Sequence, residues 1–335
     1  MDTQHSVTPE AGKDYPRNWN EFLDWFASEG ACLAYLEGLR WPQGFVCPSC
    51  GVLQPAYRSS RLRLMCRSCG HQSSVTAGTI FDKTRTPLRV WLAAAWYLTN
   101  QKQGVSALSL QRVLGLGSYQ TAWTMLHRFR RAMVRPDRDR LKGQVELDET
   151  YLSISDKDAP MPDERRKRRK SRTHQVLVVI AVELLQPRGF GRIRLRRIDN
   201  DSAEQVVPFV QDNIEPAAEV RTDGSAAYRE LKDLGYAHQR SVMLGSDVPA
   251  HVSMAGVHRV ASLIKRWILG THHGSVQPAH LDAYLDEFVF RFNRRTSSSR
   301  GHAVLPTLAT GRRHRSGDLR QRRQATTQGG EAEVG

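Results

Sequence analysis

Two aspartates, Asp148 and Asp223, have the residue type and the setting for metal-assisted chemistry. Each lies in or directly after a short strand-like stretch, 144–152 and 218–224. Carboxylates that hold two divalent cations can stabilise both the attacking and the leaving oxygen of a phosphoryl transfer. The pair therefore predicts a site for Mg²⁺ or Mn²⁺ that acts on a phosphodiester, if the fold brings the two side chains together.

The stretches around these aspartates must form the elements that position them. The apolar run 175–183 is typical of a strand buried on both faces. Residues 191–198 alternate apolar residues with arginines, as a half-exposed strand does, and a helix follows from Ser202. Three strands, a helix and a fourth strand ending at Asp223 give the order of a ribonuclease-H-like fold. In that arrangement the first acid lies on the first strand and the second lies just after the fourth.

A second constellation is built from cysteines. Two C-x2-C pairs are separated by 15 residues, and they are Cys47, Cys50, Cys66 and Cys69. This spacing predicts a zinc site with four thiolate ligands, and a glycine after each pair permits the tight turn. Such a site has no open coordination position, so the expected Zn²⁺ is structural; the alternative is four buried free thiols. We expect a small hairpin between the pairs, and Cys32 as a core residue.

A helix-turn-helix is expected upstream of the first aspartate. Helical patterns at 106–114 and 119–134 are joined by a short glycine-containing turn, and Ser118 can cap the second helix. Three polar residues are candidates to reach base edges: Gln120, Thr121 and Thr124. Three basic residues are candidates to meet phosphates: Arg128, Arg130 and Arg131. The alternative is an ordinary helical hairpin with a solvated basic face.

Composition points to a polyanionic partner. The chain has 335 residues, with 49 Lys+Arg against 34 Asp+Glu and a net charge of +15. This excess favours nucleic acid, although a ribosomal or a membrane-surface protein would share it. The longest apolar runs are far shorter than the roughly 18–20 residues of a membrane span, and the first residues lack the apolar core of a signal peptide. We therefore expect a soluble, intracellular protein.

A change of hydrophobic period at 144, after a polar linker, gives the main domain boundary. The expected architecture is an α/β catalytic domain with a ribonuclease-H-like mixed sheet and flanking helices, preceded by a small zinc ribbon and an all-α helix-turn-helix region. The expected segments are a disordered 1–14, an N-terminal helix and zinc ribbon at 15–82, the helix-turn-helix region at 83–137, the catalytic domain at 138–300 and a basic disordered tail at 301–335. Six consecutive cationic residues at 165–170 predict a loop that is mobile until it meets a polyanion.

Together these residues resemble the ISXO-like transposases of bacterial insertion sequences, which couple a zinc ribbon to a ribonuclease-H-like domain. The matching stretches are Leu39–Cys47, Ser74–Phe81, Gly115–Trp123, Val145–Tyr151, Thr222–Gly224, Lys265–Gly274 and Tyr284–Arg295. The resemblance implies metal-dependent cleavage at transposon ends, followed by attack of the freed 3′-hydroxyl on target DNA. Asp148 and Asp223 match the first two metal ligands of the family. The implied partner is double-stranded DNA, bound by at least a homodimer in the bacterial cytoplasm.

The third ligand position departs from the family pattern. The family usually places an Asn, sometimes a Glu, a few residues after a His and just before a Leu-Lys pair; in that register this chain has Leu263. Leucine cannot coordinate Mg²⁺, which needs oxygen ligands. Either Ser262 or a nearby polar group substitutes, or the site is impaired. His258 is a candidate to assist the site, and Lys265 and Arg266 are candidates to hold phosphate.

Two alternatives remain beside an active DNA transposase that binds terminal inverted repeats and catalyses strand cleavage and transfer. One is a catalytically impaired relative that only binds those repeats, which the leucine at position 263 favours. The other is a zinc-ribbon transcription regulator, which would not need aspartates at positions 148 and 223. Uptake of Mg²⁺ or Mn²⁺ separates the regulator from the enzyme, because the regulator needs structural zinc alone.

Overall fold

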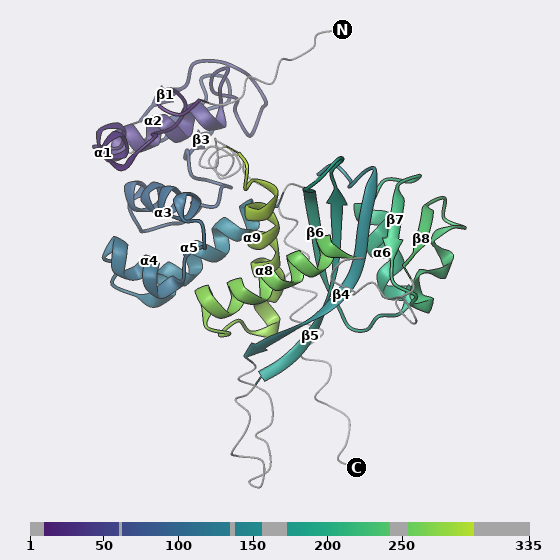
Figure 1. Cartoon of the computed structure of the whole chain (residues 1–335). Helices are drawn as coiled ribbons and strands as arrows, with labels where there is room; N and C mark the ends of the chain where they lie inside the picture. The colour runs from purple at the N-terminus through teal and green to yellow at the C-terminus, as the bar shows by residue number, and fades with distance from the viewer. Residues whose placement is uncertain (1–9, 60–61, 135–137, 156–172, 242–253, 298–335) are drawn as a thin grey trace, which may run out of the picture. The chain divides into compact units, whose positions relative to one another are not determined.

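The computed structural model describes residues 10–59, 62–134, 138–155, 173–241 and 254–297 (Figure 1). It divides the chain into two compact units, one built from residues 18–91 and one built mainly from residues 92–297. The expectations for residues 1–9, 165–170 and 301–335 fall outside the described residues.

The smaller unit begins with two helices, α1 (Trp19–Trp25) and α2 (Glu29–Arg40). The sequence pattern predicts one helical stretch here, but Ser28 starts a new helix by accepting a hydrogen bond from the N–H of Ala31 at 3.2 Å. Three short antiparallel strands follow, β1 (Tyr57–Arg58), β2 (Leu64–Met65) and β3 (Gln72–Ser73). The hairpin predicted between the cysteine pairs is confirmed, and β3 extends it.

Three helices connect the cysteine region to the sheet: α3 (Leu88–Asn100), α4 (Ala107–Leu114) and α5 (Tyr119–Ala132). Ser106 and Ser118 cap α4 and α5 through their hydroxyl oxygens, which accept from backbone N–H groups at 3.1 and 3.2 Å. The predicted pair of helices and its short turn are therefore present.

The central sheet has five strands: β4 (Gln144–Ser155), β5 (Thr173–Leu184), β6 (Phe190–Ile198), β7 (Glu219–Thr222) and β8 (Ala237–Arg240). Their order is β6-β5-β4-β7-β8, with β4, β5 and β6 antiparallel and β7 and β8 running parallel to β4. The predicted ribonuclease-H-like mixed sheet is confirmed. Strand β8, which is short, polar and largely exposed, was not expected from the sequence.

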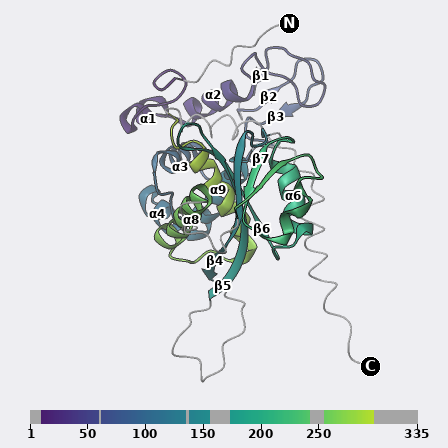
Figure 2. The ribbon, with the colours of Figure 1, turned by 45° about the vertical axis from the view of Figure 1, so that its right-hand side comes forward.

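Helices cover both faces of this sheet (Figure 2). One face packs against α8 (Ala255–His272) and α9 (Leu281–Asn293), which a short turn at Pro278–His280 connects. The other face packs against α6 (Ala203–Asn213) and the 3-10 helix η2 (Ala226–Leu231). Alternate residues of β5 are buried in the two cores, so the prediction that this strand is buried on both faces is confirmed.

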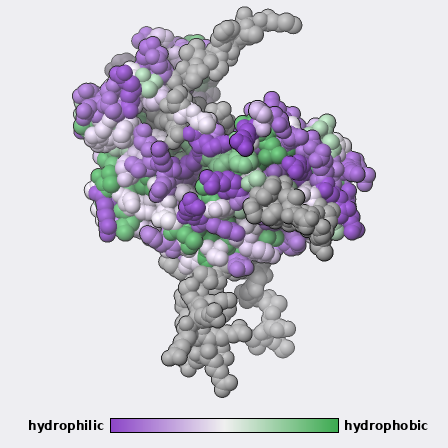
Figure 3. All heavy atoms as spheres, in the orientation of Figure 1, coloured by the Kyte–Doolittle hydropathy of each residue, from purple (hydrophilic) through white to green (hydrophobic). Residues whose placement is uncertain are grey.

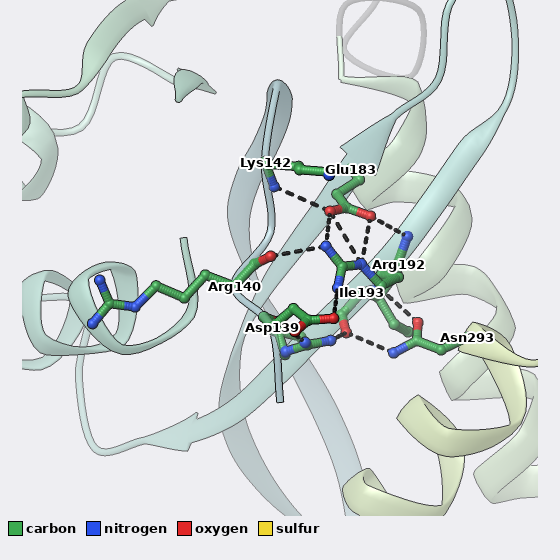
Figure 4. Close-up of polar contacts among 8 residues, drawn as sticks. Asp139, Arg140, Lys142, Glu183, Arg192, Ile193 and Asn293 are labelled. Carbon is green, nitrogen blue, oxygen red and sulfur yellow. Dashed lines mark hydrogen bonds and ion pairs between the residues drawn. The ribbon is translucent and has the colours of Figure 1, made fainter. Parts of the chain in front are cut away.

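A polar network closes one end of the sheet (Figure 4). The guanidinium of Arg192 donates to the buried Glu183 carboxylate at 2.7 Å and to the carbonyl oxygen of Arg140 at 2.8 Å. Burial alone would raise the pKa of Glu183, but the hydrogen bonds from Arg192 outweigh it and lower that pKa. The side-chain amide of Asn293 bonds both the N–H and the C=O of Ile193, at 2.7 and 3.2 Å. The end of α9 is thereby fixed to β6.

Hydrophilic residues cover most of the face drawn in Figure 3. Exposed large apolar side chains include Leu108 and Val113 of α4 and Tyr119 of α5. Within the described part of the chain, no helix combines the length and the hydropathy that crossing a membrane requires.

Candidate active site

The pairing of β4 with β7 brings the two aspartates together. The parallel register sets Glu146 opposite Arg221. Asp148 lies two residues further along β4, and Asp223 lies two residues beyond Arg221, directly after the end of β7. Residues directly opposite each other project from the same face of a sheet, because side chains alternate along both strands. Asp148 therefore lies on the face of Glu146 and Arg221, close to the point where β7 ends and Asp223 follows.

The electrostatics of Asp148 agree with this arrangement. Burial raises the pKa of Asp148, and repulsion from the Asp223 carboxylate raises it further. The N–H of Glu149 donates to Asp148 at 2.8 Å, and this bond and His258 offset part of the rise. The carboxylate of Asp223 accepts from the N–H of Ser225 at 2.9 Å, which fixes the turn after β7. Neither aspartate forms an ion pair with another described residue, so the pair is a site of concentrated negative charge.

Glu146 lies on the same face, but its carboxylate already accepts hydrogen bonds from the start of helix α8. Its side chain is 3 % exposed, and one carboxylate oxygen accepts from the N–H groups of Gly256 and Val257 at 2.7 and 3.0 Å. A Cβ on Gly256 would lie 2.8 Å from that oxygen, so the close approach requires glycine. Glu146 thus caps the start of α8, and α8 carries the remaining candidate residues of the site.

Glu149 projects to the opposite face, as strand alternation predicts. It accepts a hydrogen bond from the hydroxyl of Tyr228, a fully buried residue of η2. Burial raises the pKa of Glu149 to about 7, and the charges of Asp148 and Asp223 contribute to the rise. This pair was not expected from the sequence, because alternation shows the face of Glu149 but not the helix that covers it.

Helix α8 presents His258 to the aspartates and Leu263 to the core. His258 lies near enough to Asp148 to lower its pKa, and the Nε2 atom of His258 is buried without a hydrogen-bond partner among the described residues. Leu263 packs against the apolar core between the sheet and the two C-terminal helices. At about 100° per residue, Leu263 is turned roughly 140° from His258, whereas Ser262 and Lys265 share the side of His258 and are exposed.

The candidate DNA-contacting residues differ in exposure. Four have exposed side chains, namely Gln120, Thr124, Arg131 and Arg266, and two are half-buried, namely Thr121 and Arg128. The expectation that Arg130 meets phosphate is wrong. Arg130 is 1 % exposed, its Nε donates to the buried Glu287 carboxylate at 2.8 Å, and its guanidinium lies 3.8 Å from the ring centroid of Tyr284. A run of basic residues late in a helix does not reveal which of them turns toward a neighbouring helix.

The four predicted zinc ligands form a compact cluster. All four sulfur atoms lie within 4.8 Å of one another, with 3.7 Å between Cys47 and Cys69 and 3.6 Å between Cys50 and Cys66. Four sulfurs about 2.3 Å from one tetrahedral zinc lie about 3.8 Å apart, so the cluster fits a structural zinc ion. A backbone hydrogen bond from Cys69 contributes most to lowering the pKa of Cys66 to about 6, which favours the thiolate.

The knuckle glycines and the remaining cysteine also agree with the sequence prediction. Gly51 and Gly70 have φ of 74° and 71°, in the left-handed region that glycine tolerates. Each N–H closes its turn on the first cysteine of the knuckle, at 2.9 and 3.0 Å. Cys32 is fully buried in α2, as predicted for a core residue.

Comparison with known proteins covers both the sheet domain and the cysteine cluster. Residues 140–293 match the ISXO2-like transposase domain, and residues 27–72 match the transposase zinc-ribbon domain. The chain thus carries a region similar to the ISXO2-like transposase domain, preceded by one similar to the transposase zinc-ribbon domain. Over 296 residues it is 28 % identical to the "Uncharacterized protein in transposable element ISH50" of Halobacterium salinarum, covering 84 % of this chain and 96 % of that protein.

Solved structures give weaker similarities to this chain. The catalytic core domain of BIV integrase superposes with a TM-score of 0.27 and 15 % identity, over 44 % of this chain and 81 % of that one. The Mos1 transposase paired-end complex with left transposon end superposes with a TM-score of 0.24 and 14 % identity, over 66 % of this chain and 80 % of that one.

Proposed function

We propose that this chain is the transposase of its insertion sequence, which binds terminal inverted repeats and catalyses metal-dependent strand cleavage and strand transfer. The observation that carries the proposal is the closeness of Asp148 on β4 to Asp223 directly after β7, with neither side chain in an ion pair among the described residues. Carboxylate oxygens suit Mg²⁺ and Mn²⁺. When bound there, the cations supply a Lewis acid for the phosphate and charge stabilisation for the attacking and leaving oxygens.

In this proposal His258 is the third polar side chain of the site. Hard cations prefer oxygen to imidazole, so we assign His258 to the attacking hydroxyl or the scissile phosphate rather than to the metal. Its unpaired Nε2 atom supports this role. Lys265 lies about two turns further along the same side of α8 and holds a neighbouring phosphate. Arg266, which is exposed, is a second phosphate contact.

DNA binding is assigned to the zinc ribbon and the helix pair α4–α5. The exposed Gln120 and Thr124 at the start of α5 would read base edges, together with the half-buried Thr121. Arg128 and Arg131 would contact phosphates. The net charge of +15 supports a polyanionic partner. Cleavage of two transposon ends in one reaction requires at least two active sites, so we propose a homodimer or larger assembly on double-stranded DNA, in the bacterial cytoplasm.

A cleavage assay tests the enzymatic proposal. The substrate is a plasmid that carries both ends of the insertion sequence, incubated with the purified chain and Mg²⁺ or Mn²⁺. We expect Asp148→Asn and Asp223→Asn to lower strand cleavage by more than about 100-fold while DNA binding persists, because each removes a metal-binding charge. Asp282→Asn is the matched control, since Asp282 is exposed in the first turn of α9. Equal amounts of cleaved product from the native chain and from Asp148→Asn would refute the proposal that this chain is an enzyme.

The second candidate is a catalytically impaired relative that only binds terminal repeats. The packing of Leu263 against the core favours it, because the register that the family uses for a third ligand here holds an apolar side chain. Native protein that binds the ends, takes up Mn²⁺ and yields no cleaved strand would select this candidate. Binding of Zn²⁺ alone, with no Mn²⁺ uptake that Asp148→Asn removes, would select a zinc-ribbon regulator.

A further inference from the structure

The smaller unit contains an open cleft of about 850 Å³. Its walls come from the end of α2, the hairpin that joins the cysteine pairs, strand β3 and the turn at 76–84. The cleft lining includes Arg40, Trp41, Arg63, His71, Ser73 and Lys83. The zinc cluster and the proposed active site do not include these residues.

One cation of the cleft is held rigidly. Arg40 donates through Nη1 to the carbonyl oxygens of Ser74 and Val75, at 3.2 and 2.7 Å, and its guanidinium lies 4.6 Å from the ring centroid of Trp41. Burial lowers the pKa of Arg40, and the nearby carboxylate of Asp82 partly offsets this effect. Arg40 therefore fixes the turn to α2 and carries a positive charge into the wall.

Three further basic side chains are exposed in the cleft. Arg63, His71 and Lys83 form no side-chain hydrogen bond or ion pair with other described residues. Arg40, Arg63 and Lys83 give the lining three permanent positive charges, and Asp82 gives it one carboxylate. Unpaired cations on several walls of one depression attract an extended anion.

A buried hydroxyl gives a second and independent indication of a ligand. Ser73 is 4 % exposed and lies in the lining, yet its Oγ has no hydrogen-bond partner among the described residues. Buried hydroxyls in folded proteins are nearly always hydrogen-bonded, so an unpaired one beside a cleft is the position of a missing acceptor or donor. A phosphate oxygen would accept from it.

We propose that this cleft binds the sugar–phosphate backbone of one DNA strand. The geometry favours phosphates over bases, because Arg40 covers a face of Trp41 and Phe45 packs against that ring at 4.9 Å, which leaves it a poor platform for base stacking. Arg63 and Lys83 contact successive phosphates, and Ser73 donates to one of them. The cleft thus contributes affinity and register without reading sequence. This inference rests on the proposed function, because it presumes that the chain acts on DNA.

The test measures the salt dependence of DNA binding by the full zinc-loaded chain. The probe is a fluorescein-labelled duplex of mixed sequence, and binding is followed by anisotropy over a salt series. The slope of log K against log[salt] is negative, and each lost phosphate contact reduces its magnitude by about 0.9. Arg63→Gln with Lys83→Asn should therefore reduce that magnitude by about 1.8. Asn is chosen because residue 83 has φ of 55°. Ser73→Ala should weaken binding roughly fivefold without lowering the unfolding temperature.

The matched control is Arg67→Gln with Arg89→Gln, which removes the same charge from exposed positions of the same unit outside the cleft. If the cleft variants and this control shift the slope equally, the cleft assignment is wrong while the proposed function stands. If the native chain does not bind the duplex, both fail together. If polyglutamate at the same charge concentration competes as well as unlabelled DNA, the cleft is a general anion site and the DNA assignment is overturned. Bound zinc is measured for every variant, and Ser73→Ala remains decisive if the double variant loses its metal.

Discussion

His258 and Leu263 lie five residues apart on one helix and face different surroundings, so their substitution should affect different properties. We predict that His258→Ala lowers single-turnover cleavage by about 100-fold, the usual contribution of a positioned acid–base group. Leu263→Met should leave cleavage within about twofold and cost less than about 1.5 kcal/mol of unfolding free energy, because it conserves volume in the core. Cleavage by both variants is measured with pre-nicked and intact ends at saturating enzyme, and urea denaturation gives the unfolding free energy.

The variant Leu263→Asn tests whether position 263 can act as a third ligand position, which would contradict the role assigned to His258. An amide at this position would be partly buried against apolar neighbours, so we expect lower stability and no gain in cleavage. A variant that cleaves faster than the native chain, together with an active His258→Ala, would show that the site uses the third-ligand position of the family.

The aspartate pair was predictable from sequence for a physical reason. Strand periodicity and the order of elements place Asp148 on β4 and Asp223 just after β7, and the parallel pairing of these two strands then brings the residues near each other. The roles of Glu149 and Arg130 were not predictable in this way. Each depends on a partner that only the packed structure supplies, Tyr228 for Glu149 and Glu287 for Arg130.

At the scale of elements, the start of α8 depends on one carboxylate of β4. We predict that Glu146→Ala costs about 1–3 kcal/mol of unfolding free energy, because two buried N–H groups lose their acceptor. Glu146→Gln should cost less, since its amide oxygen still accepts. Cleavage should fall with Glu146→Ala as well, because α8 carries His258. Urea denaturation and the plasmid assay measure the two effects.

The control for Glu146, which caps α8 from strand β4, is an acid in the first turn of a different helix. Glu204 occupies that position in α6 and is exposed, so Glu204→Ala should cost less than about 1 kcal/mol. Equal losses for the two variants would mean that Glu146 acts through the helix dipole alone and not through its buried hydrogen bonds.

Elements with strong periodicity were predicted well, and short polar ones were not. The apolar run of β5 and the alternation of β6 determine their type from local sequence. Strand β8 has the sequence Ala-His-Gln-Arg and forms because β7 offers it a parallel edge. The single helical stretch expected near the N-terminus is two helices, since an N-cap at Ser28 outweighs the continuing apolar pattern.

At the scale of the molecule, the pair α4–α5 and the sheet domain share one compact unit. Arg130 of α5 and Arg291 of α9 both bond the buried Glu287, each at 2.8 Å. Arg291 also donates to the carbonyl oxygens of Leu98 and Gln101 at 2.9 and 2.7 Å, at the end of α3. The change of period at 144 therefore marks a change of secondary structure rather than a break between cores.

This buried cluster predicts how stability responds to mutation. Glu287→Ala leaves Arg130 buried without a counter-charge and should cost about 3–5 kcal/mol of unfolding free energy. The double variant Arg130→Met with Glu287→Leu removes both charges and should recover most of that loss, because apolar side chains of similar size can replace a buried pair. Urea denaturation at pH 7 measures both. A double variant as unstable as Glu287→Ala would mean that the pair is needed for more than charge neutrality.

The same cluster predicts acid sensitivity with a defined sign. Burial alone would raise the pKa of Glu287, but Arg130 and Arg291 outweigh it and hold that pKa at about 2. A glutamate in the unfolded chain has a pKa of about 4.3, so the stability from this group is fully present above that value and is lost as pH falls toward 2. Unfolding free energy measured from pH 6 to pH 2 should therefore fall more steeply for the native chain than for the double variant Arg130→Met with Glu287→Leu. Parallel curves would show that other carboxylates, such as Glu183, whose pKa is also lowered, carry the acid response instead.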